Sequence, residues 1–195
     1  MRERVDTDVA IAGRDRIERR KSAAATAFVK NDDVFERVIE PPEPLSTTWF
    51  RLEMLAPVHN ERDYEAWMSS AEHIHGTAGF AQSDWPGDDW PAPMTLDQNL
   101  VDLEQHHREF IAGEAFAYSV LDGDEVIGCV YINPDDGGGA ADAMVRSWVR
   151  ASHAERDLDL SLEIDQWLRD AWPLRSRRWP GRPALGSEPG EGVPT

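Results

Sequence analysis

The stretch between residues 116 and 132 constrains the fold more than any other part of the sequence. Its first half alternates between apolar and other side chains, as in a strand with one buried face. The side chains that share this face are Phe116, Tyr118 and Val120. Asp122-Gly123 follows, a pair that tolerates the positive φ of a tight turn. The apolar run Val126–Ile132 then predicts the return strand of a β-hairpin, and Gly128 within it predicts a bulge or a close backbone contact.

Helical patterns flank this hairpin on both sides. The clearest helix begins at Thr95, whose side chain forms a capping box with that of Gln98, and it ends at Gly113. Its predicted apolar stripe is Leu96, Leu100, Leu103, His107 and Ile111. An earlier helix is predicted from Asn60 as its N-cap, with a stripe of Tyr64, Trp67, Met68 and Ala71. A later helix is predicted before Pro173, with a stripe of Leu160, Ile164, Trp167 and Leu168.

Further strands complete the predicted order of elements. They are Trp49–Leu55, Ala143–Val149 and a short last strand within Leu174–Trp179. The order is therefore strand, helix, helix, hairpin, strand, helix, strand. This order favours the α+β class, a mixed α/β domain in which helices pack on a mostly antiparallel central sheet.

The charge of the chain is strongly acidic and unevenly distributed. The formal net charge is −17, made up of +3 over residues 1–30, −22 over residues 31–172 and +2 over residues 173–195. An acidic surface of this kind repels the phosphate backbone of nucleic acids. We therefore expect an acidic protein that does not bind nucleic acid and whose charge favours solubility.

The cysteine and histidine content predicts the compartment and the metal content. A single cysteine, Cys129, excludes an internal disulfide and indicates a reducing compartment, so we expect a cytoplasmic protein. It lies in the apolar hairpin, which favours a small buried residue over a nucleophile. No apolar stretch approaches the ~18 residues needed to cross a bilayer. His73 and His75, like His106 and His107, lack the spacing of a metal site, so no metal is expected.

Composition also divides the chain. Residues 1–45 are predicted to be a partly disordered N-terminal arm that ends in a proline-rich spacer. Residues 46–182 are the predicted folded domain. Residues 183–195 are rich in glycine and proline and are predicted to be a disordered tail.

Two segments carry a family resemblance. Gly123–Ile132 resembles the second and third strands of the GNAT N-acetyltransferase superfamily, in which an apolar-Gly-x-apolar pattern recurs, and Val145–Arg150 is similar to the fourth strand. With the element order, the resemblance covers about residues 46–182. It implies a GNAT-like fold and the transfer of an acetyl group from acetyl-CoA to a primary amine of a small molecule or peptide. The short C-terminus implies a shortened member that lacks the C-terminal strands of a full-length one.

The resemblance also implies where the cofactor binds. In the family, the pantetheine arm pairs with backbone exposed where the fourth and fifth strands diverge, and the pyrophosphate binds at the start of the next helix. Carried over to this chain, the cofactor-binding residues are Val149, Arg150, Arg156, Leu160 and Ser161. The family's phosphate loop reads Gln or Arg, x, x, Gly, x, Gly or Ala. Arg156 matches it, but Asp159 replaces the first glycine and Asp157 adds a second carboxylate, so the loop is degenerate.

The predicted substrate loop spans residues 76–93 and contains Trp85 and Trp90 among prolines and aspartates. In the family, this loop commonly borders the acceptor, and aromatic rings with carboxylates suit an ammonium group. Packing of both tryptophans on the core is the alternative. For the general base, Glu125, Asp124 and a water relay all remain open, so the catalytic residue is unknown.

Several functions remain open at this point. The leading one is acetyl-CoA-dependent N-acetyl transfer. A non-catalytic interaction or regulatory module that keeps the fold without binding CoA is the alternative, and Asp157 and Asp159 favour it. A metal-assisted hydrolase using His73 and His75 would require stoichiometric metal. For the substrate side of a shortened member, three options remain: a partner in a homodimer supplies the missing wall, the N-terminal arm fills it, or the domain no longer catalyses a reaction.

Overall fold

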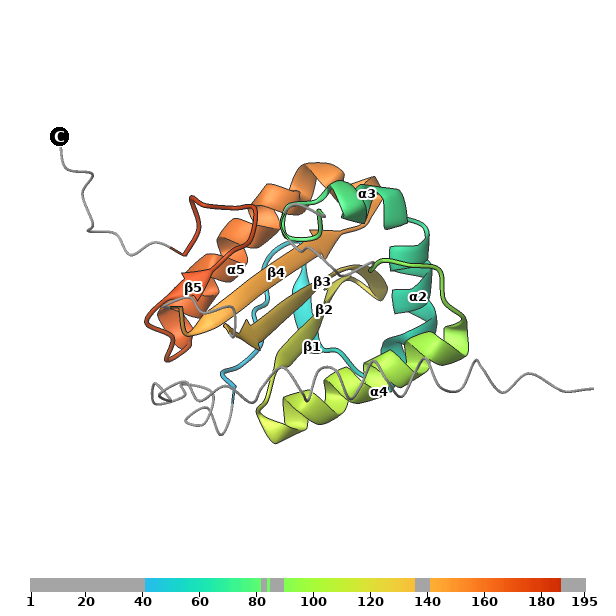
Figure 1. Ribbon diagram of the computed structural model, residues 1–195, viewed down its shortest axis with the longest axis horizontal. Helices are drawn as coiled ribbons and strands as arrows, with labels where there is room; N and C mark the ends of the chain where they lie inside the picture. Colours follow the sequence, from blue (N-terminus) through green and yellow to red (C-terminus); the bar gives the residue numbers. More distant parts are fainter. Residues whose placement is uncertain (1–40, 82–83, 85–89, 136–140, 187–195) are drawn as a thin grey trace, which may run out of the picture. The chain divides into compact units, whose positions relative to one another are not determined.

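The predicted hairpin forms the middle of a five-stranded sheet (Figure 1). The computed structural model describes residues 41–81, 84, 90–135 and 141–186 and orders the strands β1-β2-β3-β4-β5. Their bounds are β1 Arg51–Met54, β2 Phe116–Asp122, β3 Glu125–Pro134, β4 Ala143–Val149 and β5 Arg177–Arg178. The first four pair antiparallel, and β5 pairs parallel to β4. The mostly antiparallel sheet predicted from the sequence is confirmed, and no strand follows β5 within the described residues.

Helices cover both faces of this sheet, which confirms the α+β class. The helical elements are η2 Pro57–His59, α2 Asn60–Met68, α3 Ala71–Gly76, α4 Leu96–Ala112, η3 Ala151–Arg156 and α5 Asp157–Ala171. Helix α5 packs on one face through its predicted stripe of Leu160, Ile164, Trp167 and Leu168. The other face packs against residues of α2, α3 and α4, namely Ala66, Trp67, Ile74 and Leu103. Alternate side chains of the strands therefore enter two separate cores.

Helix α4 begins and ends as predicted, but its buried face differs. The Thr95–Gln98 capping box is present, and Gly113 ends the helix with a left-handed backbone. The buried residues are Asn99 and Leu103, whereas the predicted stripe residue Ile111 is 70% exposed. That part of the predicted stripe is wrong: Ile111 lies exposed in the last turn of the helix, and a polar residue of the first turn, Asn99, takes a buried position in a hydrogen-bond network.

The helix predicted from Asn60 is divided in two, and the predicted N-cap is wrong. Asn60 is the first helical residue after the N-cap His59, and its side chain donates to the Leu96 carbonyl instead of capping the helix. Helix α2 ends at Met68, which is 38% exposed, and α3 starts at Ala71. The Ser69 hydroxyl donates to the Ala66 carbonyl, and such side-chain bonds compete with the helical backbone. The predicted continuous stripe through Met68 and Ala71 is therefore wrong.

Gly128 makes the close backbone contact that the sequence predicts. A Cβ at this position would lie 2.2 Å from the Trp148 carbonyl oxygen on β4. The β2–β3 register also shifts between Val120 and Leu121, which is the predicted bulge. Cys129 beside it is fully buried, and burial raises the pKa of its thiol well above the usual range, so the thiol stays protonated.

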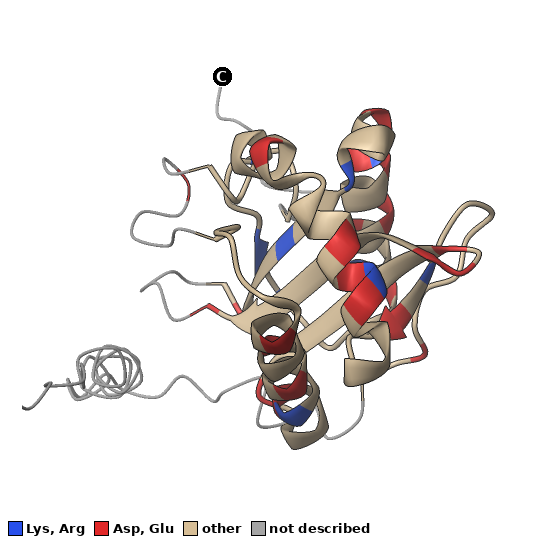
Figure 2. Ribbon diagram, turned by 90° about the vertical axis from the view of Figure 1, so that its right-hand side faces the viewer, with Lys and Arg blue, Asp and Glu red and all other residues tan. Residues whose placement is uncertain are grey.

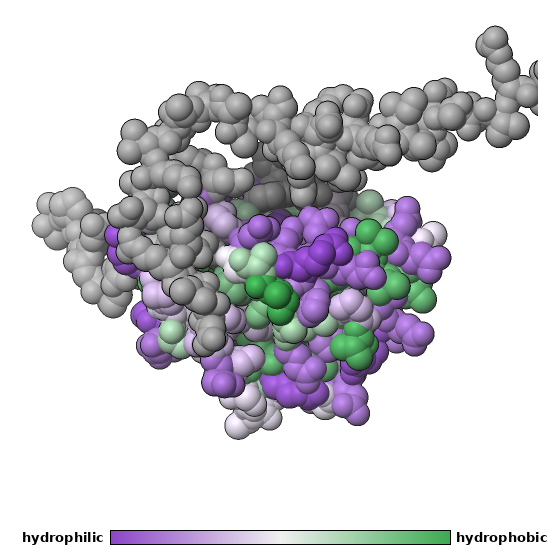
Figure 3. Space-filling model, turned by 90° about the horizontal axis from the view of Figure 1, so that it is seen from below, coloured by the Kyte–Doolittle hydropathy of each residue, from purple (hydrophilic) through white to green (hydrophobic). Residues whose placement is uncertain are grey.

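The surface of the described residues is acidic with isolated apolar side chains. Figure 2 shows acidic residues on the helices and on the strand ends, with few basic ones among them. In the view of Figure 3, hydrophobic residues are separated by polar ones. The exposed large apolar side chains are Val58, Met68, Val101, Ile111, Leu158 and Leu162. No helix among the described residues is long and apolar enough to cross a membrane.

The described residues extend slightly beyond the predicted domain of 46–182. Leu45 and Leu185, one residue before it and three after it, both pack against the α5-side core. Residues 1–40 of the predicted arm and residues 187–195 of the predicted tail lie outside the described residues.

Candidate functional site

Strand β5 leaves the edge of β4 after two residues. It pairs with β4 only at Ala143 and Met144, where β4 begins, and Figure 1 shows it beside one end of the longer strand. The rest of the β4 edge has no strand neighbour on this side among the described residues. The two strands therefore diverge as the family resemblance implies.

The register with β3 decides where the remaining backbone groups of β4 point. The Arg150 amide donates to the Ile127 carbonyl at 2.7 Å, so every second residue before Arg150 also bonds to β3. Ser147 and Val149 lie between those residues and turn their N–H and C=O groups toward the β5 side. There they form no hydrogen bond with any part of the chain that the structure describes.

This unpaired edge is enclosed by the protein. Ser147 and Val149 are buried, and buried backbone groups are almost always paired. Beside β5, Gly79 lies against Pro180, because a Cβ on Gly79 would be 3.3 Å from the Pro180 carbonyl oxygen. The Gly79 amide also donates to Asp84 at 3.0 Å. A ligand that paired with the β4 edge would therefore require movement near Gly79 and Pro180.

Arg150, one of the predicted cofactor residues, is engaged by other side chains. Its guanidinium donates to Glu125 at 2.6 Å and more weakly to Glu65 and Ser69. The next amide, that of Ala151, donates to the Ser70 hydroxyl at 3.0 Å. The connection between α2 and α3 therefore occupies the polar groups that follow β4.

Arg156 lies at the start of α5 and is about half exposed. Its guanidinium carbon is 5.3 Å from the centre of the Trp49 ring, and one of its nitrogens is 3.3 Å from Asp159. The indole of Trp49 is held in turn by a hydrogen bond to Glu163 at 2.9 Å. Among the predicted cofactor residues, Arg156 is the one that presents an exposed positive charge near this helix end.

The carboxylate of Asp157 does not face the helix end unpaired. Arg182 donates to both of its oxygens, at 2.8 and 2.7 Å, and its own side chain is largely buried. Both contacts come from the same nitrogen, Nη2, and this ion pair neutralises one of the two carboxylates that make the loop degenerate. Sequence reasoning missed Arg182 because it lies 25 residues after Asp157.

Leu160 and Ser161 lie on the buried face of α5. Both are fully buried, and the Ser161 hydroxyl donates to the carbonyls of Asp157 and Leu158. In this conformation neither reaches the helix end, so their contact with phosphate stays a prediction. Val149 is likewise buried at the end of β4.

Trp90 lies at the centre of an aromatic cluster on the other face of the sheet. Its ring centre is 5.4 Å from that of Phe80, 6.2 Å from those of Trp67 and Trp148, and 6.4 Å from that of Tyr131. Trp90 therefore packs against the core, as the alternative interpretation predicts for it. Trp85, its predicted partner, lies outside the described residues.

A buried carboxyl that sequence reasoning did not single out lies next to this cluster. Asp63 of α2 is 4% exposed and accepts a hydrogen bond from the Asn99 side chain at 3.0 Å. The same Asn99 accepts from the Trp67 indole at 2.8 Å. Burial raises the pKa of Asp63 to about 6, and the Asn99 bond and His106 oppose this rise only in part. The signal in the sequence is an aspartate one helical turn before a core tryptophan.

A second buried polar group has a structural role. His59 of η2 bonds to the Ser119 hydroxyl at 2.9 Å and to Glu53 at 3.1 Å. Burial lowers the pKa of His59, although Glu53 acts in the opposite direction. Ser119 is fully buried in the sheet, so no substrate meets this serine, and the three residues tie η2 to β1 and β2.

The remaining predicted polar residues are distributed as follows. Glu125, one candidate for the general base, pairs with Arg150. The backbone carbonyl of Asp124, the other candidate, accepts from Arg62 at 2.7 Å. His106 stacks near Tyr131, with ring centres 5.6 Å apart. Within the described ranges, no three His, Cys, Asp or Glu side chains gather as metal ligands.

Comparisons with known proteins bear on the fold. No protein-family model matches the chain, and no curated protein matches it. Among solved structures, it is similar to the microcin C7 self-immunity acetyltransferase MccE in complex with acetyl-CoA and AMP (14% identity, TM-score 0.49, covering 64% of this chain and 63% of that one). It is also similar to a ribosomal-protein-S5-alanine acetyltransferase from Vibrio fischeri (14% identity, TM-score 0.48, covering 69% of this chain and 71% of that one).

A further similar structure is the ribosomal L7/L12 alpha-N-protein acetyltransferase RimL (14% identity, TM-score 0.45, 66% of each chain). The chain thus spans slightly less than two thirds of RimL and of MccE. At these identities and scores, the likeness carries no argument about activity. The GNAT-like fold predicted from the sequence is confirmed in the order of its elements and in the topology of its sheet.

Proposed function

We propose that this chain is an acyl-CoA-dependent N-acetyltransferase-like protein that transfers an acetyl group to a primary amine. One observation carries the proposal: the β4 edge at Ser147 and Val149 turns backbone groups toward the side that β5 has left, and these groups have no partner among the described residues. An extended chain with amide groups is the natural partner of such an edge. The pantetheine arm of acetyl-CoA is a chain of this kind.

The described residues fit the two parts of the cofactor unequally. The β4 edge fits the pantetheine arm. The phosphate end fits less well, because Leu160 and Ser161 are buried and the Ala151 amide is already bonded to Ser70. Arg156 and Arg182 are the cations near the start of α5, and Arg182 is paired with Asp157. If phosphate bound here, Arg182 would therefore have to exchange the Asp157 carboxylate for the phosphate of the ligand.

On the acceptor side, the Trp90 cluster and Asp63 supply what an ammonium group requires. Aromatic faces attract a cation, and a carboxylate compensates its charge. When bound, the cofactor supplies an acetyl group activated as a thioester, and the acceptor amine must be neutral to attack it. With its pKa raised to about 6, Asp63 is deprotonated near neutral pH and is able to take up a proton.

Calorimetric titration with acetyl-CoA at moderate salt tests the proposal. We expect binding at micromolar strength, and a slow approach to saturation because the segments at Gly79 and Pro180 must separate. Acetylpantetheine should bind measurably by itself, because the β4 edge contacts that part of the cofactor. Absence of heat with millimolar acetyl-CoA would remove the acyltransferase proposal.

Arg156→Ala provides the matched variant for the phosphate end. The side chain is exposed, so the melting temperature should stay nearly unchanged, while acetyl-CoA binding weakens at least several-fold. Binding of acetylpantetheine, which has no diphosphate, should not change. Arg108→Ala on α4, also exposed, is the control. Equal acetyl-CoA binding by the Arg156 variant and the control would contradict the assignment of Arg156.

A non-catalytic interaction or regulatory module is the second candidate, and a specific observation favours it. Ser70, Glu125 and Asp157 bond to Ala151, Arg150 and Arg182, so the chain's own groups satisfy the region that would hold the phosphates. In that case neither acetyl-CoA nor acetylpantetheine binds, and a search for protein partners replaces the enzyme assay.

We also propose a cytoplasmic location and an acceptor that is a small molecule or a peptide amine. The buried, protonated thiol of Cys129 supports a reducing compartment. A homodimer would supply a substrate-side wall from its second protomer, since no strand follows β5 within the described residues. Light scattering on the purified chain, at several concentrations, distinguishes a dimer from a monomer.

A further inference from the structure

Arg177 on β5 is a buried arginine that uses only part of its hydrogen-bonding capacity. Its side chain is 1% exposed, and its Nε donates to Asp165 Oδ1 of α5 at 3.1 Å. The two terminal nitrogens, Nη1 and Nη2, have no hydrogen-bond partner among the described residues. Four N–H groups of a charged side chain are therefore buried without an acceptor in the part of the chain that the structure describes.

The charge around Arg177 is also unbalanced. Asp165, its only bonded carboxylate in the described part of the chain, is shared with Arg169 of the same helix and with the Trp179 indole at 3.0 Å. Two guanidinium groups thus face one carboxylate. Asp165 and Arg177 are buried, whereas the Arg169 side chain is 35% exposed, so solvent reaches the excess positive charge only from the Arg169 side.

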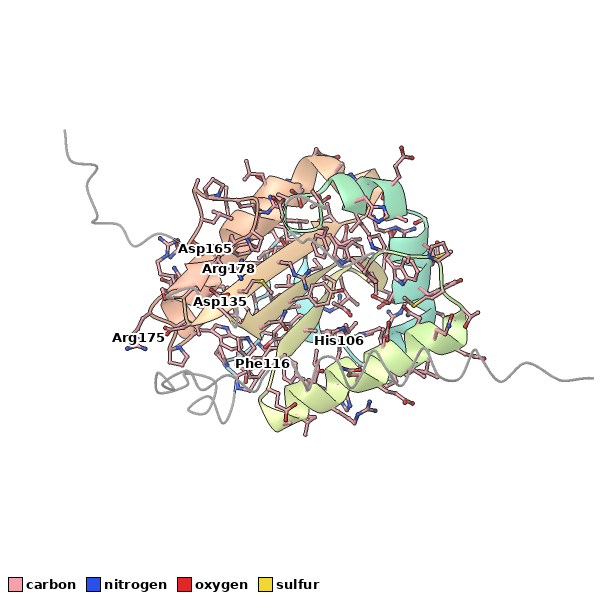
Figure 4. The ribbon with its side chains drawn as sticks, viewed as in Figure 1. His106, Phe116, Asp135, Asp165, Arg175 and Arg178 are labelled. Atoms are coloured by element: carbon pink, nitrogen blue, oxygen red, sulfur yellow. The ribbon has the colours of Figure 1, made fainter. Side chains whose placement is uncertain are left out.

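Neighbouring ion pairs do not supply the missing negative charge. The Arg178 guanidinium donates to both carboxylate oxygens of Asp135, and Arg175 pairs with Asp142. Figure 4 labels Asp135, Arg175 and Arg178 together with Asp165 around the β5 end of the sheet. Each of these two carboxylates has its own arginine, so the surplus remains at Arg177.

We propose that a small monovalent anion of the size of chloride binds Nη1 and Nη2 of Arg177 between β5 and α5. A buried charged group with unpaired donors is strongly destabilising, and an anion supplies both the acceptor and the charge. A water molecule would accept the hydrogen bonds but would leave the charge uncompensated. The burial of the side chain restricts the site to a ligand of very few atoms.

Thermal unfolding of the wild-type chain at constant ionic strength tests the site. Replacing sodium gluconate by sodium chloride step by step should raise the melting temperature by about 3–5 °C and then saturate, because a ligand that binds only the folded state stabilises it. Sodium bromide should act similarly. Constant ionic strength separates this effect from general screening of the acidic surface. Equal melting temperatures in gluconate and chloride would overturn the proposal and indicate water.

Arg177→Met tests whether the effect belongs to this residue. The substitution leaves Asp165 paired with Arg169 and Trp179, so the remaining charges balance. The chloride dependence should disappear in this variant and persist in Arg108→Met, whose exposed side chain lies on α4. If Arg177→Met does not fold, crystals of the wild-type chain grown in bromide provide the second readout. Anomalous scattering beside Arg177 would support the site, and its absence there would contradict it.

Discussion

Replacing Asp63 by asparagine should make the protein more stable at pH 8, by about 3 kcal/mol in the free energy of unfolding. Burial raises the pKa of this carboxyl from 3.8 to about 6, while the unfolded chain keeps the lower value. Between the two values the folded state binds more protons. Stability is therefore greatest in acid and is lost as the pH rises through about 6. Asparagine stays neutral at every pH and avoids this loss.

Urea unfolding of both proteins between about pH 4 and pH 8 measures the effect. The two stabilities should agree near pH 4 and separate as the pH rises to about 6, with the variant higher. Glu104→Gln is the matched control, since Glu104 is half exposed on α4, and its stability should follow that of the wild type. A wild type no less stable at pH 8 than the Asp63 variant would mean that contacts other than the Asn99 bond stabilise the carboxylate.

The same variant separates structure from function at Asp63. A carboxyl that destabilises the folded state at neutral pH is a candidate for a functional role. If acetyl transfer is established, Asp63→Asn should be more stable but slower, and the rate of the wild type should rise through about pH 6. An unchanged rate and pH profile would limit Asp63 to packing between α2 and α4.

Replacing Gly128 by alanine should destabilise the protein by more than about 3 kcal/mol. The new Cβ would lie 2.2 Å from the Trp148 carbonyl oxygen and 3.2 Å from the Cα of Val149. Both are backbone atoms of the central sheet, so no side chain can rotate away. The β3–β4 pair would have to separate where Cys129 and Trp148 are fully buried.

Two other glycines provide the comparison. A Cβ on Gly76, at the end of α3, would meet no atom within 4 Å, so Gly76→Ala should leave stability nearly unchanged. Gly123 in the hairpin turn also has open space but a φ of +55°, so Gly123→Ala should cost about 1 kcal/mol. Denaturant midpoints of the three variants, measured together, give the order. A loss at Gly128 no greater than that at Gly123 would show that the strands adjust easily.

Local patterns were sufficient for most elements of the fold. The alternation around the Asp122-Gly123 turn, the capping box at Thr95 and the apolar stripe before Pro173 all depend on residues within one or two turns of each other. Each of these predictions is confirmed. Two parts of the predicted stripes failed, at Ile111 and at Met68, where the Ser69 hydroxyl bonds to the Ala66 carbonyl as the helix ends. The burial of Asn99 was also not predicted, because it depends on bonds to Asp63 and Trp67 in another helix.

The candidate sites depend on contacts between residues far apart in the chain. Arg182 reaches Asp157, Ser70 reaches Ala151 and Asn99 reaches Asp63. The sequence around a polar residue does not indicate which distant residue will form its hydrogen bond. The carry-over from the family resemblance placed Arg156 near the start of α5, but it did not show that Leu160 and Ser161 would face the core.

By itself, the sequence determined the element types, the hairpin, the two caps of α4 and the acidic surface, because these follow from periodicity, turn geometry and charge within short stretches. Only the tertiary structure decided which polar groups are buried and which of them have a partner within the described residues. The β4 edge at Ser147 and Val149, the carboxyl of Asp63 and the guanidinium of Arg177 acquire their properties from burial and from strand register. Both are produced by packing of distant segments, which no local pattern specifies.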